Sequence, residues 1–173
     1  MTFATDNGPA SAEALVEFAS KLGGLPDDYR EFIAAHNGVS LSGTAELRGP
    51  DKWAVETIEG IQVTEFWHED YPKNSMPIAS DGSCNTYLMG LAGESRGRIY
   101  FLDGALAAEA EKPAEHLPLV AESFSEFLSR IQDFDPDRPE SEELFYILAE
   151  RRRKTEEQRQ AILNPTNPWW KIW

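Results

Sequence analysis

Residues 76–103 constrain the fold of this chain more than any other stretch. They contain two apolar runs, 87–91 and 98–101, which are rich in Ile, Leu, Tyr and Phe. Such residues suit the half-buried surface of a sheet, and the glycine- and serine-containing break between the runs predicts an antiparallel hairpin. Just upstream, residues 80–85 combine Ser, Asp, Gly and Asn, which form side-chain turns and tolerate left-handed backbone. This segment is predicted to be a shaped loop that leads into the hairpin.

Two amphipathic helices are predicted before the hairpin. The first begins at Ser11, a good N-cap, and stops at the glycine pair 23–24. Its apolar face follows the i, i+3, i+4, i+7 spacing of Leu15, Phe18, Ala19 and Leu22. The second helix follows Pro26 and is predicted to end at the Asn-Gly pair 37–38, where these residue types favour left-handed backbone. Its predicted buried residues are Tyr29, Phe32 and Ile33.

The segments that flank the hairpin show weaker patterns. Residues 44–48 and 57–63 alternate weakly and are predicted as strands, and residues 67–72 are predicted as a polar, aromatic loop. Beyond the hairpin, residues 105–111 are consistent with a short helix that the next proline ends. A further helix is predicted from the N-cap Ser123, with one apolar face formed by Phe124, Phe127, Leu128 and Ile131.

Residues 133–173 differ in composition from the rest of the chain. An acidic, proline-containing linker at 133–140 precedes a long predicted helix with Ser141 as its N-cap, and the chain ends with three tryptophans. Because each tryptophan buries a large apolar area, the tail is expected to fold back onto its own chain; the alternative is that it anchors a partner. The predicted organisation is an α+β domain at 1–132, with a linker, C-terminal helix and tail at 133–173 packed on it.

The composition is that of one globular domain. The 173 residues are 41% hydrophobic and 27% charged, so the chain needs neither a disulfide nor a metal to form a core. The single cysteine, Cys84, excludes an internal disulfide and a multi-cysteine zinc site. The N-terminus has no signal-peptide pattern, and the sequence has no run of about 18 apolar residues. We therefore expect a cytoplasmic protein.

The chain is strongly acidic, with 30 Asp and Glu residues against 16 Lys and Arg and a net charge of −14. Such a field repels nucleic acid and anionic membranes and speeds encounter with a basic partner. The alternative is that the acidity only keeps the protein in solution. No nucleic-acid or membrane partner is predicted, because the basic run at 151–154 is expected to be solvated or paired with nearby glutamates. The sequence indicates no oligomeric state.

No catalytic residue, cofactor or metal site is predicted. Phosphate-binding, dinucleotide-binding and serine-nucleophile motifs are absent from the sequence. Cys84 lies near Asp81 and Asn85, but no motif places a histidine beside it, so it is interpreted as a small buried residue at the start of a strand. The residues at 68–70 lack further metal ligands nearby, and the acidic run at 133–137 lacks the glycine and glutamate of a calcium loop.

Four segments occur in an order that resembles a known superfamily. They are LGGLPDDYREFI at 22–33, closed by Asn-Gly; MPIASDG at 76–82, followed by Asn85 and Tyr87; GRIYF at 97–101; and VAESFSEFL at 120–128. Over residues 11–132 this order resembles the SUKH superfamily, which includes the yeast cell-wall glucan synthesis regulator and many bacterial immunity proteins. The resemblance implies an α+β fold in which an antiparallel sheet packs against helices.

The resemblance also implies that the protein works by binding. Bacterial members of the superfamily often neutralise a toxin by binding it in the cytosol, and a basic toxin domain, such as a nuclease, suits the negative charge. We expect a non-enzymatic immunity protein without a cofactor. Its predicted partner-binding residues are Trp67, Glu69, Asp70, Tyr71, Asp81, Ser83 and Asn85. The alternative is an intracellular regulatory or scaffold module that recruits partners through its C-terminal helix and tail.

Overall fold

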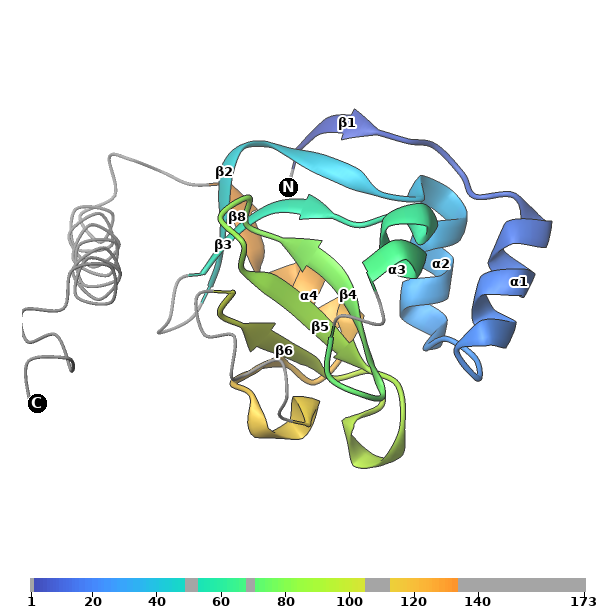
Figure 1. Ribbon diagram of the computed structural model, residues 1–173. Coiled ribbons are helices and arrows are strands. Elements are labelled where there is room, and N and C mark those ends of the chain that lie inside the picture. The colour runs from blue at the N-terminus through green and yellow to red at the C-terminus, as the bar shows by residue number, and fades with distance from the viewer. Residues whose placement is uncertain (1, 49–52, 68–70, 105–112, 134–173) are drawn as a thin grey trace, which may run out of the picture. The chain divides into compact units, whose positions relative to one another are not determined.

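An antiparallel sheet forms the centre of the computed structural model, which describes residues 2–48, 53–67, 71–104 and 113–133 (Figure 1). The strand order is β1-β2-β3-β4-β5-β6-β7, and β8 pairs with β2. All neighbouring strands are antiparallel. The strands are β1 (Phe3–Asp6), β2 (Val39–Leu47), β3 (Ala54–Ile58), β4 (Ser75–Ser80), β5 (Thr86–Gly90), β6 (Ile99–Leu102), β7 (Leu119–Ala121) and β8 (Ile131–Asp133).

Four α-helices accompany the sheet in the described part of the chain, so the predicted α+β fold is confirmed. They are α1 (Ala12–Lys21), α2 (Asp27–His36), α3 (Ile61–Trp67) and α4 (Phe124–Arg130), with 3-10 helices at η2 (Gly93–Ser95) and η4 (Ala114–His116). The predicted short helix at 105–111, and the linker, helix and tail predicted beyond residue 133, lie outside the described residues. The two-part organisation therefore stays a prediction.

Local capping signals set the ends of the helices that were predicted correctly. The hydroxyls of Ser11 and Ser123 each accept a hydrogen bond from the amide of the third helical residue, at 3.1 Å, at the starts of α1 and α4. α2 ends at Asn37, whose backbone is left-handed with φ 42° and ψ 44°. α4 stops one residue earlier than its apolar pattern indicates, because Ile131 has extended backbone and begins β8.

The predicted hairpin is formed by β5 and β6, with Tyr87 opposite Phe101. The residue pattern did not predict β4, which pairs with the other side of β5. Pro77 obscures this strand, because proline lacks the amide donor of a regular ladder. The structure accommodates it beside an irregularity, since the register of β4 against β5 shifts between Pro77 and Ala79.

The strand predicted at 57–63 is wrong in its second half. β3 ends at Ile58, and α3 begins at Ile61. The Oδ1 atom of Asn37 accepts a hydrogen bond from the Ile61 amide at 3.1 Å and supplies an N-terminal cap that the local sequence lacks. Trp67, predicted to start a loop, is the last residue of α3. The strand predicted at 44–48 is the second part of the longer β2.

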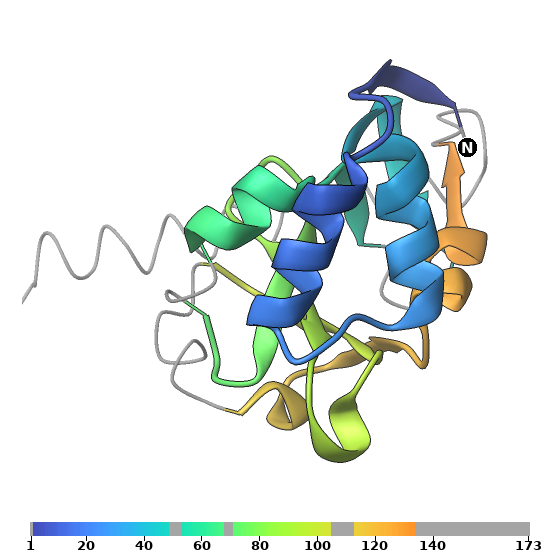
Figure 2. The ribbon, with the colours of Figure 1, turned by 90° about the vertical axis from the view of Figure 1, so that its right-hand side faces the viewer.

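The ribbons of α1 and α2 lie side by side in front of the sheet in Figure 2. Aromatic side chains join α2 and α4 to one face of the sheet. The ring centroids of Tyr29 in α2 and Phe124 in α4 are 5.0 Å apart in an edge-to-face contact, and those of Tyr87 in β5 and Phe127 in α4 are 5.2 Å apart. Side chains of β5 and β6 that point to the opposite face form a second cluster, which contains Leu88, Tyr100, Leu102, Ala114, Leu117 and the partly buried Tyr71. The sheet is therefore covered on both faces around β5 and β6.

The first strand is attached to the end of α2 by a pair of contacts. The Nδ1 atom of His36 lies 2.8 Å from Oδ2 of Asp6, and the His36 ring meets Phe3 edge-on with centroids 5.2 Å apart. His36 lies in the last turn of α2, where the helix dipole favours a cation. These contacts place the residues of β1 beside the corner where α2 leads into β2.

Candidate functional site

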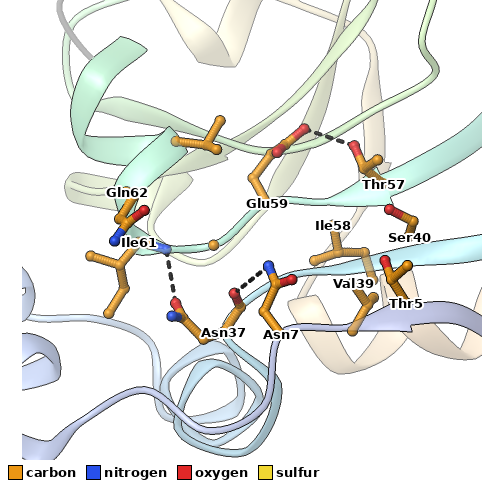
Figure 3. A pocket seen from close by; sticks show the side chains of 12 residues that line it. Thr5, Asn7, Asn37, Val39, Ser40, Thr57, Ile58, Glu59, Ile61 and Gln62 are labelled. Atoms are coloured by element: carbon orange, nitrogen blue, oxygen red, sulfur yellow. Dashed lines mark hydrogen bonds between the residues drawn. The ribbon is translucent and has the colours of Figure 1, made fainter.

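A polar pocket lies where β1, the end of α2, the start of β2, the end of β3 and the start of α3 meet (Figure 3). Its volume is about 410 Å³. We call it the Glu59 pocket. Its lining residues are Thr5, Asn7, Asn37, Val39, Ser40, Thr57, Ile58, Glu59, Gly60, Ile61, Gln62 and Val63.

Asn37 holds the base of the Glu59 pocket together. Its backbone carbonyl accepts a hydrogen bond from Asn7 Nδ2 at 3.2 Å, and its side-chain oxygen accepts one from the Ile61 amide at 3.1 Å (Figure 3). Gly60 lies directly against the same residue, because a Cβ atom placed on it would be 2.3 Å from the carbonyl oxygen of Asn37. Position 37 therefore requires a residue that adopts left-handed backbone and has a side-chain hydrogen-bond acceptor, and position 60 requires glycine.

Glu59 carries the charge of the pocket. Its Oε1 atom accepts hydrogen bonds from the hydroxyls of Thr57 at 2.8 Å and Ser80 at 2.9 Å. The half-buried carboxylate is thereby held in one orientation, while no lysine, arginine or histidine of the described residues forms an ion pair with it. Since an ionised carboxylate only accepts hydrogen bonds, Glu59 keeps acceptor capacity for a donor from outside the described fold.

A row of hydroxyl side chains crosses the sheet beside Glu59. The strand register places them opposite one another in the order Thr5, Ser40, Thr57, Ser80 and Thr86, from β1 to β5. Directly opposed residues in antiparallel strands point to the same face, so the five hydroxyls form a continuous polar stripe. The stripe ends at Leu102, opposite Thr86, which belongs to the second cluster.

The turn at 81–85 adjoins this stripe and is stabilised by its own side chains. Asp81 Oδ1 accepts hydrogen bonds from the amides of Ser83 at 2.8 Å and Asn85 at 3.2 Å, and Asp81 Oδ2 accepts one from Asn85 Nδ2 at 2.6 Å. Burial, and to a smaller extent the Asp81 carboxylate, raises the pKa of Tyr87, which donates a hydrogen bond to the Ala54 carbonyl at 2.5 Å. Asp81 therefore orders the turn as well as adding negative charge to it.

A third carboxylate lies over the same turn. Glu56 is an exposed residue of β3, and a Cβ atom placed on Gly82 would be 1.8 Å from its Oε2 atom. Glu56 thus lies within β3, Glu59 follows the end of β3, and Asp81 follows the end of the neighbouring β4. No lysine, arginine or histidine in the described ranges forms an ion pair with Glu56 or Asp81. The Glu59 pocket and the adjoining Glu56 and turn at 81–85, which together we call the pocket face, therefore have uncompensated negative charge within the described fold.

The model of the SMI1 / KNR4 family (SUKH-1) matches residues 9–130. The chain belongs to this family. The matched residues include every described element from α1 to α4, whereas β1 and β8 lie outside them. A comparison with curated proteins finds no match.

The SUKH-1 fold brings together part of the predicted partner-binding set. The Tyr71 hydroxyl lies 3.3 Å from Oγ1 of Thr86, the residue after Asn85, so Tyr71 and the turn at 81–85 meet at the start of β5. Ser83 is exposed, whereas Asn85 is half-buried and bonds Asp81 and the Gly104 amide, the latter at 3.2 Å. Trp67 closes α3, and Glu69 and Asp70 lie outside the described residues.

The expectation that Cys84 is buried at the start of a strand is wrong. Cys84 is exposed in the turn with a left-handed φ of 77°, and β5 begins two residues later. Cys84 lies in the turn that Asp81 holds through the amides of Ser83 and Asn85, so it precedes the buried strand. The described residues contain no group of three or more His, Cys, Asp or Glu arranged to hold a metal.

The sequence of this SUKH-1 chain did not predict that Glu56 or Glu59 belongs to the candidate site. It also did not predict that the side-chain amides of Asn7, Asn37 and Gln62 line a pocket. Glu59 precedes a glycine after a strand, which is a common loop pattern and carries no local sign of a cavity. The lining residues come from segments as far apart as residues 5 and 63, so only the strand register assembles them. The described part of the chain contains no helix that is both long and apolar enough to span a membrane.

Proposed function

We propose that this SUKH-1 protein is a non-enzymatic, cytoplasmic immunity protein that neutralises a basic toxin domain by forming a one-to-one complex with it. The observation that carries the proposal is the negative charge of the Glu59 pocket and of the adjoining strand and turn, where Glu59, Glu56 and Asp81 have no ion-pair partner in the described fold. Family membership supports a binding role, because bacterial members of the superfamily often act by binding toxins.

The distribution of cations strengthens the electrostatic argument. Three described cations pair with other carboxylates: Lys21 with Glu17 at 3.0 Å, Arg30 with Asp27 at 2.8 Å and Arg98 with Glu122 at 2.8 Å. These pairs neutralise charge on α1, α2 and the β6–β7 edge and leave the pocket face negative. On a chain of net charge −14, such a face attracts a basic surface and raises the rate of encounter.

The decisive experiment is growth rescue with the toxin domain encoded beside this protein. The full chain is expressed with that domain, and the pair is then examined on a sizing column. We expect rescue together with a stable one-to-one complex. Toxicity that persists despite expression of the folded chain would refute the immunity proposal, and rescue without a complex would refute stoichiometric binding.

Salt dependence tests the electrostatic part of the proposal. Screening shortens the reach of charge from about 10 Å at 0.1 M salt to about 3 Å at 1 M. We expect the association rate constant to fall by roughly tenfold or more between low and high salt, with a smaller change in the dissociation rate. An association rate that salt leaves unchanged would contradict steering by this face.

Two further variants separate the proposal from its alternatives. Cys84→Ala should retain full rescue if no thiol chemistry is involved. A chain that ends at residue 163 should still bind the toxin domain if the pocket face carries recognition. Loss of binding in that shortened chain, with the core still folded, would favour a module that recruits its partner through the C-terminal segment.

A further inference from the structure

We propose that the Glu59 pocket receives a single basic side chain, most naturally an arginine, from the bound partner. This inference rests on the proposed function, since the partner is the toxin domain. A volume of about 410 Å³ lies near the lower end of the range for ligand pockets, which suits one long side chain rather than a large cofactor. The occupant is identified by the chemistry of the walls.

The orientation of Glu59 favours a cationic donor. The hydroxyls of Thr57 and Ser80 lie within hydrogen-bond distance of its Oε1 atom and 2.7 Å from each other, so their two protons are used among these three oxygens. Within the described residues no donor contacts Oε2 of the same carboxylate. A guanidinium group has five N–H donors in one plane and matches a carboxylate with neighbouring acceptors, so it satisfies this arrangement better than a neutral group does.

The other walls exclude the competing classes of occupant. The remaining walls mix the aliphatic Val39, Ile58, Ile61 and Val63 with the hydroxyl and amide groups of Thr5, Asn7, Ser40 and Gln62. A wholly apolar anchor would leave these polar groups without partners. An anion would meet Glu59 with no described cation in the lining to offset the repulsion. A partner side chain with one positive charge and several donors is the class that the lining accommodates.

The wall contributed by β1 lies outside the residues matched by the family model. Thr5 and Asn7 precede residue 9, where the match begins, whereas Asn37, Glu59 and Gln62 lie within it. Asn7 is tied to the base of the pocket by its bond to the Asn37 carbonyl, and Thr5 stands opposite Ser40. We infer that the β1 wall adjusts which partner segment enters, while Glu59 supplies the attraction.

Two charge-matched variants of the full chain test the inference. Glu59→Gln removes the charge but keeps an oxygen that accepts from Thr57 and Ser80, so the corner should remain folded. Glu94→Gln removes one charge from an exposed position in η2, outside the pocket lining, and is the control. Equal unfolding midpoints in urea establish that both variants can be compared.

The first measurement uses a small probe and does not depend on the toxin. N-acetyl-arginine methylamide is titrated into the ¹⁵N-labelled chain, with the uncharged citrulline analogue as the matched ligand. We expect shifts of the Gly60, Ile61 and Ser40 amides with the arginine probe, and binding about tenfold or more weaker in Glu59→Gln, because a hydrogen bond to a charged group is lost. Equal responses to both ligands, or no shift of the pocket amides, would overturn the inference.

The second measurement uses the toxin domain itself. Glu59→Gln should bind it about tenfold or more weakly than Glu94→Gln, mainly through faster dissociation. Equal affinities of the two variants would refute the inference that the partner's basic side chain binds in the Glu59 pocket, while leaving the immunity function intact. Failure of the parent chain to bind the domain would instead refute the proposed function, and the probe titration would still decide what the pocket accepts.

Discussion

Asn37 connects three segments around the pocket, so replacing it measures how firmly this corner is held. The residue has left-handed backbone, its Oδ1 atom accepts the amide of the buried Ile61, and its carbonyl accepts Asn7 Nδ2. Three substitutions separate these contributions. Asn37→Asp keeps an acceptor and tolerates the backbone, Asn37→Gly keeps only the backbone freedom, and Asn37→Ala keeps neither.

The magnitudes follow from the two contacts. Leaving the Ile61 amide without its partner costs about 1–3 kcal/mol, which is the expected loss in the free energy of unfolding for Asn37→Gly. Left-handed backbone in alanine adds about 1–2 kcal/mol, so Asn37→Ala should lose about 2–5 kcal/mol in total. Asn37→Asp should stay within about 1 kcal/mol of the parent chain.

Urea unfolding followed by far-ultraviolet circular dichroism measures all four chains under one condition. The variants should share the denaturant slope of the parent, so their midpoints report stability directly. The expected order of stability is parent, Asn37→Asp, Asn37→Gly and Asn37→Ala. A glycine variant as stable as the parent would refute the reasoning, because α3 would then not depend on the side chain of Asn37.

Two further perturbations probe the same corner. Gly60→Ala would place a Cβ atom 2.3 Å from the Asn37 carbonyl oxygen, so we expect a loss of about 1–3 kcal/mol in the free energy of unfolding, and an unchanged urea midpoint would contradict the contact. The hydrogen bond from His36, together with that from the Gly8 amide, lowers the pKa of Asp6 below 3.8. A carboxyl with a lowered pKa stabilises the fold above the unfolded value and loses this effect as the pH falls through the folded value. The stability difference between the parent and Asp6→Asn should therefore be fully present above pH 3.8 and shrink as the pH falls below it, and a difference that does not change with pH in urea titrations would argue against the pair.

The elements that the sequence predicted correctly are those whose signals are local. Ser11 and Ser123 cap the helices that follow them through bonds to amides three residues away, so a short window contains the whole signal. The hairpin of β5 and β6 was predictable for a similar reason, since two apolar runs and a short break suffice. β4 was missed because Pro77 breaks the local strand pattern, and the irregularity that tolerates it depends on the partner strand.

The candidate site was largely beyond sequence reasoning. Asp81, Asn85 and Tyr71 were predicted as partner-binding residues, and the structure places them around the start of β5, with Asp81 and Asn85 bonded to each other within the turn. Their role toward a partner stays a prediction. Glu59 was not predicted, because its importance depends on hydroxyls of Thr57 and Ser80 that lie on two strands.

By itself, the sequence determined the acidic character, the α+β class, the capped helices and the central hairpin. Net charge follows from composition alone, and the capping and hairpin signals each lie within a short stretch of residues. Only the tertiary structure decided that residues 61–67 are helical and that a charged pocket exists. The Asn37 side chain caps a helix 24 residues away, and the strand register aligns five hydroxyls beside one carboxylate. Both depend on hydrogen bonds between distant segments, which form only when the sheet and helices have packed.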